Sequence, residues 1–235
     1  MALDHQSYAA WKSWDAQTFG QSTPKEQRKF QIELRPLRLP KGARILEIGF
    51  GNGSFLSWAR GHGFAVTGLE MNPILVEHAK SHGFEVVQSE NIENLGMNKY
   101  DAVVAFDVLE HLTPGQIESC LHAVEKALVS GGYFLARFPN GDSPLGLAHQ
   151  NGDVTHQTTI GFHKWIYWVK KTHLDLVSIK GQAKPIVSSN PFATSVRFIF
   201  RMIQLMAQWA YKRLFLPHYK TDYFSANIVS ILKKN

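Results

Sequence analysis

Residues 47–53 of the chain read Glu-Ile-Gly-Phe-Gly-Asn-Gly. The apolar run at residues 44–48 predicts a buried strand that leads into this loop, and residues 54–60 predict the helix that follows it. Gly49 and Gly51 let the chain turn sharply and let a ligand lie against bare backbone, facing the amides at the helix N-terminus. We therefore expect this loop to hold a nucleotide-type cofactor.

An acidic residue supports the same expectation. Glu70 ends the next apolar segment, residues 65–69. At that place a carboxylate can accept hydrogen bonds from both hydroxyls of a ribose. A dinucleotide-binding loop has Gly or Ala at the sixth position of G-x-G-x-x-G, where this chain has Ser54. The spacing G-x-G-x-G after an acidic residue therefore favours a different class of adenosine-containing cofactor.

Predicted strands and helices alternate outward from the loop. Helices are expected at residues 54–60, 73–81 and 114–129, and strands at residues 44–48, 65–69, 84–87, 101–106 and 132–138. Continuous apolar strands separated by helices indicate a parallel sheet covered on both faces. Residues 175–179 and 227–232 predict two later strands that close the sheet. We expect an α/β fold with a Rossmann-like, doubly wound sheet of about seven strands, mostly parallel with a closing antiparallel strand.

Length and composition indicate one globular domain. A chain of 235 residues with 44% hydrophobic and 19% charged residues can build one sizeable core. We expect residues 1–235 to form a single domain, with an N-terminal helical cap at residues 1–40 and a cofactor-binding core at 41–140. Residues 141–235 would form the acceptor side and a C-terminal amphipathic helix.

The single cysteine and the lack of a recognisable targeting segment favour a cytoplasmic protein. Cys120 is the single cysteine of the sequence, which excludes an intramolecular disulfide and a thiolate metal site. The N-terminal residues do not resemble a signal peptide, and no run of about 18 apolar residues occurs. We expect a cytoplasmic protein, with association at the inner face of the membrane left open.

The motifs of residues 41–140 resemble class I methyltransferases that use S-adenosylmethionine. Residues 47–53 match the family's first motif, an acidic residue followed by x-G-x-G-x-G. Residues 88–92 (Gln-Ser-Glu-Asn-Ile), 106–112 (Phe-Asp-Val-Leu-Glu-His-Leu) and 130–134 (Ser-Gly-Gly-Tyr-Phe) resemble three later motifs in the same order. The resemblance implies a methyltransferase of this fold with S-adenosylmethionine as its cofactor.

This resemblance assigns cofactor contacts residue by residue. The glycines would lie against the methionine and ribose part of the cofactor: Gly49, Gly51 and Gly53. Glu47 would lie near the methionine ammonium, and Glu70 would bind the ribose hydroxyls. The adenine would be bordered by Met71, Glu90, Asn91 and Ile92. The methyl-donor end would be lined by Asp107, Val108 and Leu109. The resemblance gives His111 a supporting role more readily than a catalytic one.

A motif in the second half points to the acceptor. The segment Asp153-Val154-Thr155-His156 resembles a bacterial subgroup of the family that accompanies glycan and polysaccharide biosynthesis. That resemblance implies O-methylation of a sugar or lipid-linked glycan hydroxyl. We expect His156 to take the hydroxyl proton as general base and Asp153 to orient its ring or bind a neighbouring hydroxyl. Alternatively, His156 only stabilises the loop by hydrogen bonding.

Other acceptors and functions remain open at this stage. The acceptor could be another small or lipid-like molecule, such as a quinone, a phenol or an amine. The chain could also be an RNA methyltransferase or a non-catalytic, cofactor-binding interaction protein. No nucleic acid is expected, because no RNA-binding module is present and the cations lie on an apolar helix. No metal is predicted either, although His149, Asp153 and His156 have a conceivable spacing for a divalent ion.

The C-terminal quarter of the chain is basic. From residue 180 onward there are nine Lys and Arg residues and one acidic residue, a net charge of +8 within a total of +6. Residues 194–215 predict a helix with five polar side chains on one stripe: Arg197, Arg201, Gln204, Gln208 and Lys212. Its other positions are largely apolar. We expect this helix to lie in an anionic membrane interface, in a homodimer interface or on its own domain, with the basic stripe outward.

Overall fold

The computed structural model describes residues 5–89, 92, 95–184, 191–215 and 224–235. Seven strands form one sheet in the order β3-β2-β1-β4-β5-β7-β6. Their bounds are β1 Arg44–Ile48, β2 Ala65–Glu70, β3 Glu85–Gln88, β4 Tyr100–Phe106, β5 Leu128–Pro139, β6 Leu174–Gly181 and β7 Asn227–Lys234. β7 runs antiparallel to β5 and β6, and the other paired strands are parallel. The predicted sheet is therefore confirmed.

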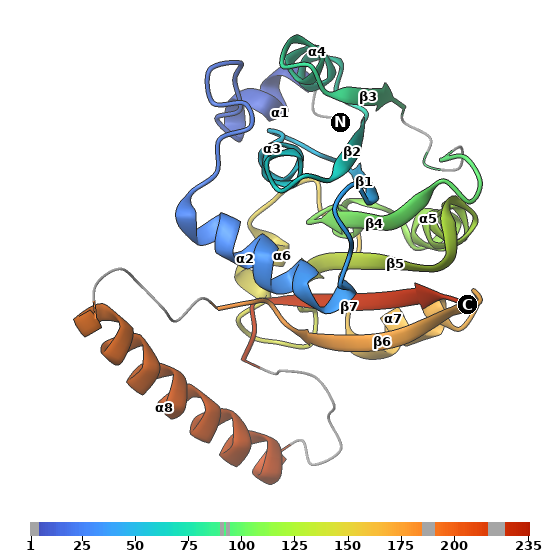
Figure 1. The fold of residues 1–235 in the computed structure, drawn as a ribbon. Coiled ribbons are helices and arrows are strands. Elements are labelled where there is room, and N and C mark those ends of the chain that lie inside the picture. The colour runs from blue at the N-terminus through green and yellow to red at the C-terminus, as the bar shows by residue number, and fades with distance from the viewer. Residues whose placement is uncertain (1–4, 90–91, 93–94, 185–190, 216–223) are drawn as a thin grey trace.

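Helices cover both faces of this sheet (Figure 1). Their bounds are α1 His5–Trp11, α2 Pro24–Leu34, α3 Ser54–Gly61, α4 Pro73–Ser81, α5 Pro114–Ala127, α6 Leu147–Asn151, α7 Phe162–Val169 and α8 Pro191–Phe215. Short 3₁₀ helices are η1 Arg35–Leu37 and η2 Leu109–His111. Thr113 begins α5 with a capping box to Gln116, which satisfies amides that the first turn leaves unbonded.

The alternating side chains of β4 show why helices must cover both faces of the sheet. Val103 and Ala105 belong to the core cluster that includes side chains of α5 and α7. Ala102 and Val104 belong to the opposite cluster, with side chains of α2 and α3. Successive side chains of a strand point to opposite faces, so all four bury only if helices lie on each side. β1 and β4 are parallel neighbours, so their carboxyl ends lie at the same edge of the sheet. Ligands of parallel α/β sheets bind at this edge.

The N-terminal segment lies against the glycine loop. The Gly20 amide donates to the Asn52 carbonyl at 2.7 Å, and the Asn52 side-chain amide donates to the Thr18 carbonyl at 2.8 Å. Phe19 is buried beside Phe50, in a core cluster that also includes residues of α3 and α4. Residues that the sequence assigned to a cap are thus in contact with the loop expected to bind the cofactor.

Helix α8 confirms the helix predicted at residues 194–215, but its polar stripe does not point outward as predicted. Gln204 donates to the Phe224 carbonyl at 3.0 Å, and the Phe224 amide donates to the Gln208 side-chain oxygen at 3.3 Å. The stripe from Arg201 to Lys212 therefore faces the rest of the chain, whereas Arg197 and the large apolar side chains are exposed. The prediction of an outward basic stripe was therefore wrong between Arg201 and Lys212, because the two glutamines bond the segment that begins at Phe224. Within the described residues, no helix has the length and apolar character needed to span a membrane.

Candidate functional site

The turn after β1 requires glycine. Gly49, Gly51 and Gly53 have φ values of 66°, 54° and 68°, in the left-handed region that favours this residue. A Cβ on Gly49 would lie 2.6 Å from a methyl carbon of Val108, and one on Gly51 would lie 2.9 Å from the Trp14 ring. Both conformation and space therefore exclude larger side chains at these turns.

A cavity of about 650 Å³ opens beside this loop, a volume typical of small-molecule sites. Six of the predicted site residues line it: Glu47, Gly49, Gly51, Asp107, Asp153 and His156. The structure thus brings the glycine loop, the residue after β4 and the Asp153–His156 segment to one place. This is the arrangement that transfer between a cofactor and an acceptor requires.

The other predicted cofactor residues have different places. Val108 lies under Gly49, and Leu109 is fully buried in the hydrophobic core, so its side chain does not line the cavity. Ile92 is partly buried against that core, whereas Met71 is half exposed. Glu90 and Asn91 lie outside the described residues.

Glu70 connects the loops after β1 and β2. One carboxylate oxygen accepts from the Gly51 amide at 3.1 Å. The other accepts from the amides of Met71 at 2.9 Å and Asn72 at 3.1 Å. These bonds hold the carboxylate at the carboxyl ends of β1 and β2, beside the glycine loop. Its placement fits the predicted role.

Glu47 is a buried carboxyl beside the glycine loop, 3% exposed, and its Oε2 atom has no hydrogen-bond partner. Burial raises the pKa of this carboxyl well above its ordinary value, and the charge of Glu70 adds to the effect. A buried acceptor without a partner is costly unless a ligand supplies a donor. The ammonium of the methionine part of S-adenosylmethionine is such a donor, so this residue fits the predicted cofactor.

Asp107 forms part of an ion-pair network that the sequence did not indicate. It has φ 57°, which aspartate tolerates better than most residues, and its carboxylate lies 2.6 Å from the Arg137 guanidinium. Arg137 also contacts Glu33 of α2 at 3.4 Å. The cavity wall therefore carries a charge-assisted network that connects β4, β5 and α2.

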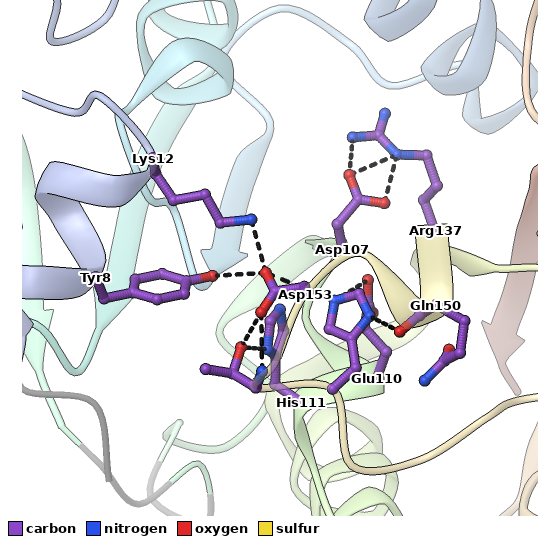
Figure 2. A network of polar contacts seen from close by, with 10 residues as sticks. Tyr8, Lys12, Asp107, Glu110, His111, Arg137, Gln150 and Asp153 are labelled. Atoms are coloured by element: carbon purple, nitrogen blue, oxygen red, sulfur yellow. Dashed lines mark hydrogen bonds and ion pairs between the residues drawn. The ribbon is translucent and has the colours of Figure 1, made fainter. Parts of the chain in front are cut away.

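Asp153 bonds the N-terminal helix (Figure 2). The Lys12 ammonium lies 2.7 Å from its carboxylate, and the Tyr8 hydroxyl donates to it at 3.5 Å. The Thr155 hydroxyl donates at 2.6 Å and the Thr155 amide at 2.9 Å. Burial raises the pKa of Asp153, but the Lys12 and Thr155 donors outweigh burial and hold the pKa well below its ordinary value.

His156 has a defined tautomer. Its Nδ1 lies 3.0 Å from the Gln150 carbonyl, which can only accept, so Nδ1 carries the proton. In the neutral ring, Nε2 therefore carries the free lone pair. Nε2 lies 3.9 Å from Glu110 and 3.9 Å from Asp153, too far for a direct hydrogen bond to either carboxylate. The predicted orientation of the ring by Asp153 is not the contact observed, because the Gln150 carbonyl orients it.

His111 and Glu110 lie beside this ring. The ring centroids of His111 and His156 are 4.6 Å apart. His111 Nδ1 lies 2.8 Å from the Thr155 hydroxyl, whose own proton goes to Asp153, so His111 also carries its proton on Nδ1. Burial lowers the pKa of His111, and the neighbouring His156 lowers it further.

Glu110 is buried, 1% exposed, with its Oε2 atom unpartnered. Burial raises its pKa well above the ordinary value, and the charge of Asp107 adds to this. Ligand atoms of Glu110, His111 and His156 lie within 4.8 Å of one another, a set that could hold a metal ion. This set differs from the spacing considered in the sequence, and the prediction of no metal remains a prediction.

Comparison with known proteins decides the family. Residues 24–182 match the family model described as a methyltransferase domain. The chain belongs to the methyltransferase-domain family. The match covers more than half of the chain and includes the glycine loop, the predicted motifs and the Asp153–His156 segment.

Relatives and solved structures agree with this methyltransferase assignment. A ubiquinone biosynthesis O-methyltransferase from Alkalilimnicola ehrlichii is 25% identical over 186 residues, covering 71% of each chain. An uncharacterized methyltransferase from Synechocystis is 28% identical over 115 residues, covering 46% of this chain and 53% of that relative. An uncharacterized Escherichia coli protein is 37% identical over 70 residues, 29% of this chain and 28% of that protein. Two of these matches thus span about half or less of the relative's length.

The fold is shared with solved methyltransferases. A SAM-dependent methyltransferase from Archaeoglobus fulgidus superposes with a TM-score of 0.67 at 20% identity, covering 97% of this chain and 99% of that chain. A TehB-like SAM-dependent methyltransferase from Corynebacterium glutamicum gives 0.60 at 18% identity, covering 98% of both chains. Family and fold together confirm the prediction of a methyltransferase with a Rossmann-like fold.

Sequence reasoning missed several residues of the methyltransferase site. Tyr8, Lys12 and Trp14 line the cavity from the N-terminal segment, and Lys29 lines it from α2. Glu110 was read only as part of a motif. An N-terminal segment that is polar and aromatic was the available signal, but it does not say which side chains reach the loop.

Proposed function

We propose that this methyltransferase methylates a hydroxyl oxygen of a sugar or lipid-linked glycan, with His156 as the general base. The observation that carries the proposal is the tautomer of His156. Its Nδ1 proton is held by the Gln150 carbonyl, so Nε2 is the nitrogen that can accept a proton, and His156 lines the cavity that also contains the glycine loop. A hydroxyl is a poor nucleophile until its proton is removed, and a positioned imidazole lone pair meets that need.

The cofactor would be held by residues that already fit it. When bound, S-adenosylmethionine would supply a methyl group attached to a positively charged sulfur. The sulfur leaves readily as a neutral thioether when the methyl group is transferred. Gly49 and Gly51 leave room at the backbone, Glu47 offers a buried acceptor to the ammonium, and Glu70 lies beside the glycine loop, where the ribose is expected. The half-buried Lys29, which also lines the cavity, is suited to the carboxylate of the methionine part.

The surroundings of His156 suit proton acceptance. The hydroxyl proton moves to Nε2, and the imidazolium that results lies 3.9 Å from the Asp153 carboxylate. Asp153 remains ionised because Lys12 and Thr155 hold its pKa down, so its negative charge stabilises the protonated ring. Asp153 therefore acts on the reaction only through the charge of His156 in this proposal.

A second acceptor class is favoured by one observation. Several relatives, including the one from Alkalilimnicola ehrlichii, are named ubiquinone biosynthesis O-methyltransferases. A phenolic hydroxyl on a lipid-like acceptor is therefore the alternative to a sugar hydroxyl. A phenol ionises more easily than a sugar hydroxyl, so its methylation would depend less on the base.

Methyl-transfer assays with His156→Ala test the proposal. The acceptors to compare are nucleotide-linked sugars, lipid-linked sugars and prenylated phenols. On a sugar acceptor we expect turnover to fall by about 10²–10⁴, the usual effect of losing a general base, with cofactor affinity unchanged within a few fold. The matched control is His173→Ala, because His173 is 93% exposed at its side chain and does not line the cavity.

The results separate the two acceptor classes. Activity on phenols alone, with a smaller effect of His156→Ala, would replace the glycan by the phenolic acceptor. Turnover that stays near wild type on the accepted substrate would contradict the role of His156 and turn attention to His111.

A further inference from the structure

Helix α8 presents a long apolar surface that the described parts of the chain do not cover. The helix has 25 residues, about 37 Å at the rise of an α-helix. Figure 1 shows it standing apart from the sheet and its covering helices. Its exposed large apolar side chains are Phe192, Phe198, Ile199, Phe200, Met202, Ile203, Leu205, Met206, Trp209, Leu214 and Phe215. An exposed apolar patch of this extent on a soluble protein marks an interaction surface.

The polar side of α8 is already occupied. Gln204 and Gln208 exchange hydrogen bonds with the backbone of Phe224, and the Tyr211 ring lies 5.5 Å from the Phe224 ring. These contacts fix which side of the helix faces the rest of the chain. The side that is left for a partner is therefore the apolar one, which includes Met206 and Trp209, each 68% exposed.

Charge selects the partner among the classes that could cover an apolar helix. The sequence of α8 contains no Asp or Glu and has four cations: Arg197, Arg201, Lys212 and Arg213. A second copy of α8 would offer these cations no acidic partner on either helix. An anionic lipid surface offers negative headgroups to the cations and hydrocarbon to the apolar side.

We propose that α8 lies in the headgroup region of an anionic lipid bilayer and docks the methyltransferase there. The aromatic and aliphatic side chains enter the outer part of the acyl region, and the flexible stems of Arg197 and Arg213 carry their charges to the phosphates. The contact lies in the plane of the membrane. This contact requires neither the proposed acceptor nor the proposed base, so it can be tested independently of the proposed function.

Vesicle flotation of the full-length protein tests the apolar contact. We expect the protein to float with vesicles of phosphatidylcholine and phosphatidylglycerol at 7:3. The double variant Met206→Glu with Trp209→Glu should bind at least tenfold more weakly, because it puts two charges on the face that enters the lipid. The control is Met97→Glu, since Met97 is 76% exposed and lies outside α8. Unchanged S-adenosylhomocysteine binding shows that each variant is folded.

A second set of measurements tests the contribution of the cations to vesicle binding and the alternative that a second copy covers α8. Arg197→Gln with Arg213→Gln, 0.5 M salt, or pure phosphatidylcholine vesicles should each reduce binding severalfold. A folded wild-type protein that ignores the anionic vesicles would overturn the proposal. So would a protein that sediments as a dimer and becomes monomeric in the Met206→Glu, Trp209→Glu variant while vesicle binding is unchanged, because a second copy would then cover α8.

Discussion

At the scale of single residues, buried carboxyls near the cavity differ in which protonation state they favour. Glu110 is buried with one oxygen unpartnered, which raises its pKa. Asp153 is also buried, although less completely, and the Lys12 and Thr155 donors lower its pKa. Two carboxyls whose pKa values are shifted in opposite directions therefore each lie 3.9 Å from Nε2 of His156.

Glu110→Gln tests the raised pKa through stability. Because the folded pKa lies above the unfolded one, the contribution of Glu110 is fully present below the ordinary glutamate pKa of about 4.3 and is lost as pH rises through the raised value. Wild-type stability should therefore fall from pH 5 to pH 8 more than that of the variant. Chemical denaturation of both proteins at several pH values measures this, and parallel stability curves would contradict it.

Residue-scale prediction from sequence worked where the signal is local. Gly49 and Gly51 are recognisable because their spacing next to a strand is itself the requirement of the turn. The pairing of Asp153 with Lys12 could not be predicted, since it joins residues far apart in the chain and nothing in the Asp153–His156 segment indicates an N-terminal partner.

At the scale of elements, the attachment of α1 across the cavity depends on the Lys12–Asp153 ion pair. Lys12→Met would leave the nearly buried Asp153 carboxylate without its cation, and we expect a loss of about 1–3 kcal/mol of stability at pH 7. The pKa of Asp153 is depressed, so its contribution is present above the unfolded pKa and is lost as pH falls through the folded one.

Urea denaturation at pH 7 and pH 3 measures that change. The difference between wild type and Lys12→Met should shrink at the lower pH. Lys25→Met is a matched control, because Lys25 is exposed at the start of α2 and forms none of the contacts of Asp153. Equal losses at both pH values, or an equal loss in the control, would contradict the account of α1.

Element boundaries followed from periodicity, whereas element orientation did not. The predicted strands and the helix at 73–81 are confirmed, because apolar runs, caps and glycines mark them locally, whereas the helix expected at 114–129 ends at Ala127, where β5 begins. The side of α8 that faces the chain was mistaken. Helical spacing shows which residues share a stripe, but hydrogen bonds from Phe224 decide which way that stripe points.

At the scale of the whole molecule, the order of the strands in the sheet determines where the site lies. The cofactor loop lies where β1 and β4 meet, and the segment after β5 supplies His156 to the same cavity. Alternating strands and helices were enough to predict this fold. The acceptor could not be deduced in the same way, because its contacts come from loops and from the N-terminal segment, whose positions depend on tertiary packing.

Calorimetry with S-adenosylhomocysteine tests the central claim most directly. We expect the wild-type protein to bind this product and not NAD, because Ser54 stands where a dinucleotide-binding loop has its third glycine. Glu70 lies beside the glycine loop, where the ribose of the product is expected. Glu70→Ala should weaken binding by at least tenfold, since hydrogen bonds to a charged group contribute about 1.5–3 kcal/mol each. Tight binding of NAD without a response to S-adenosylhomocysteine would contradict the account.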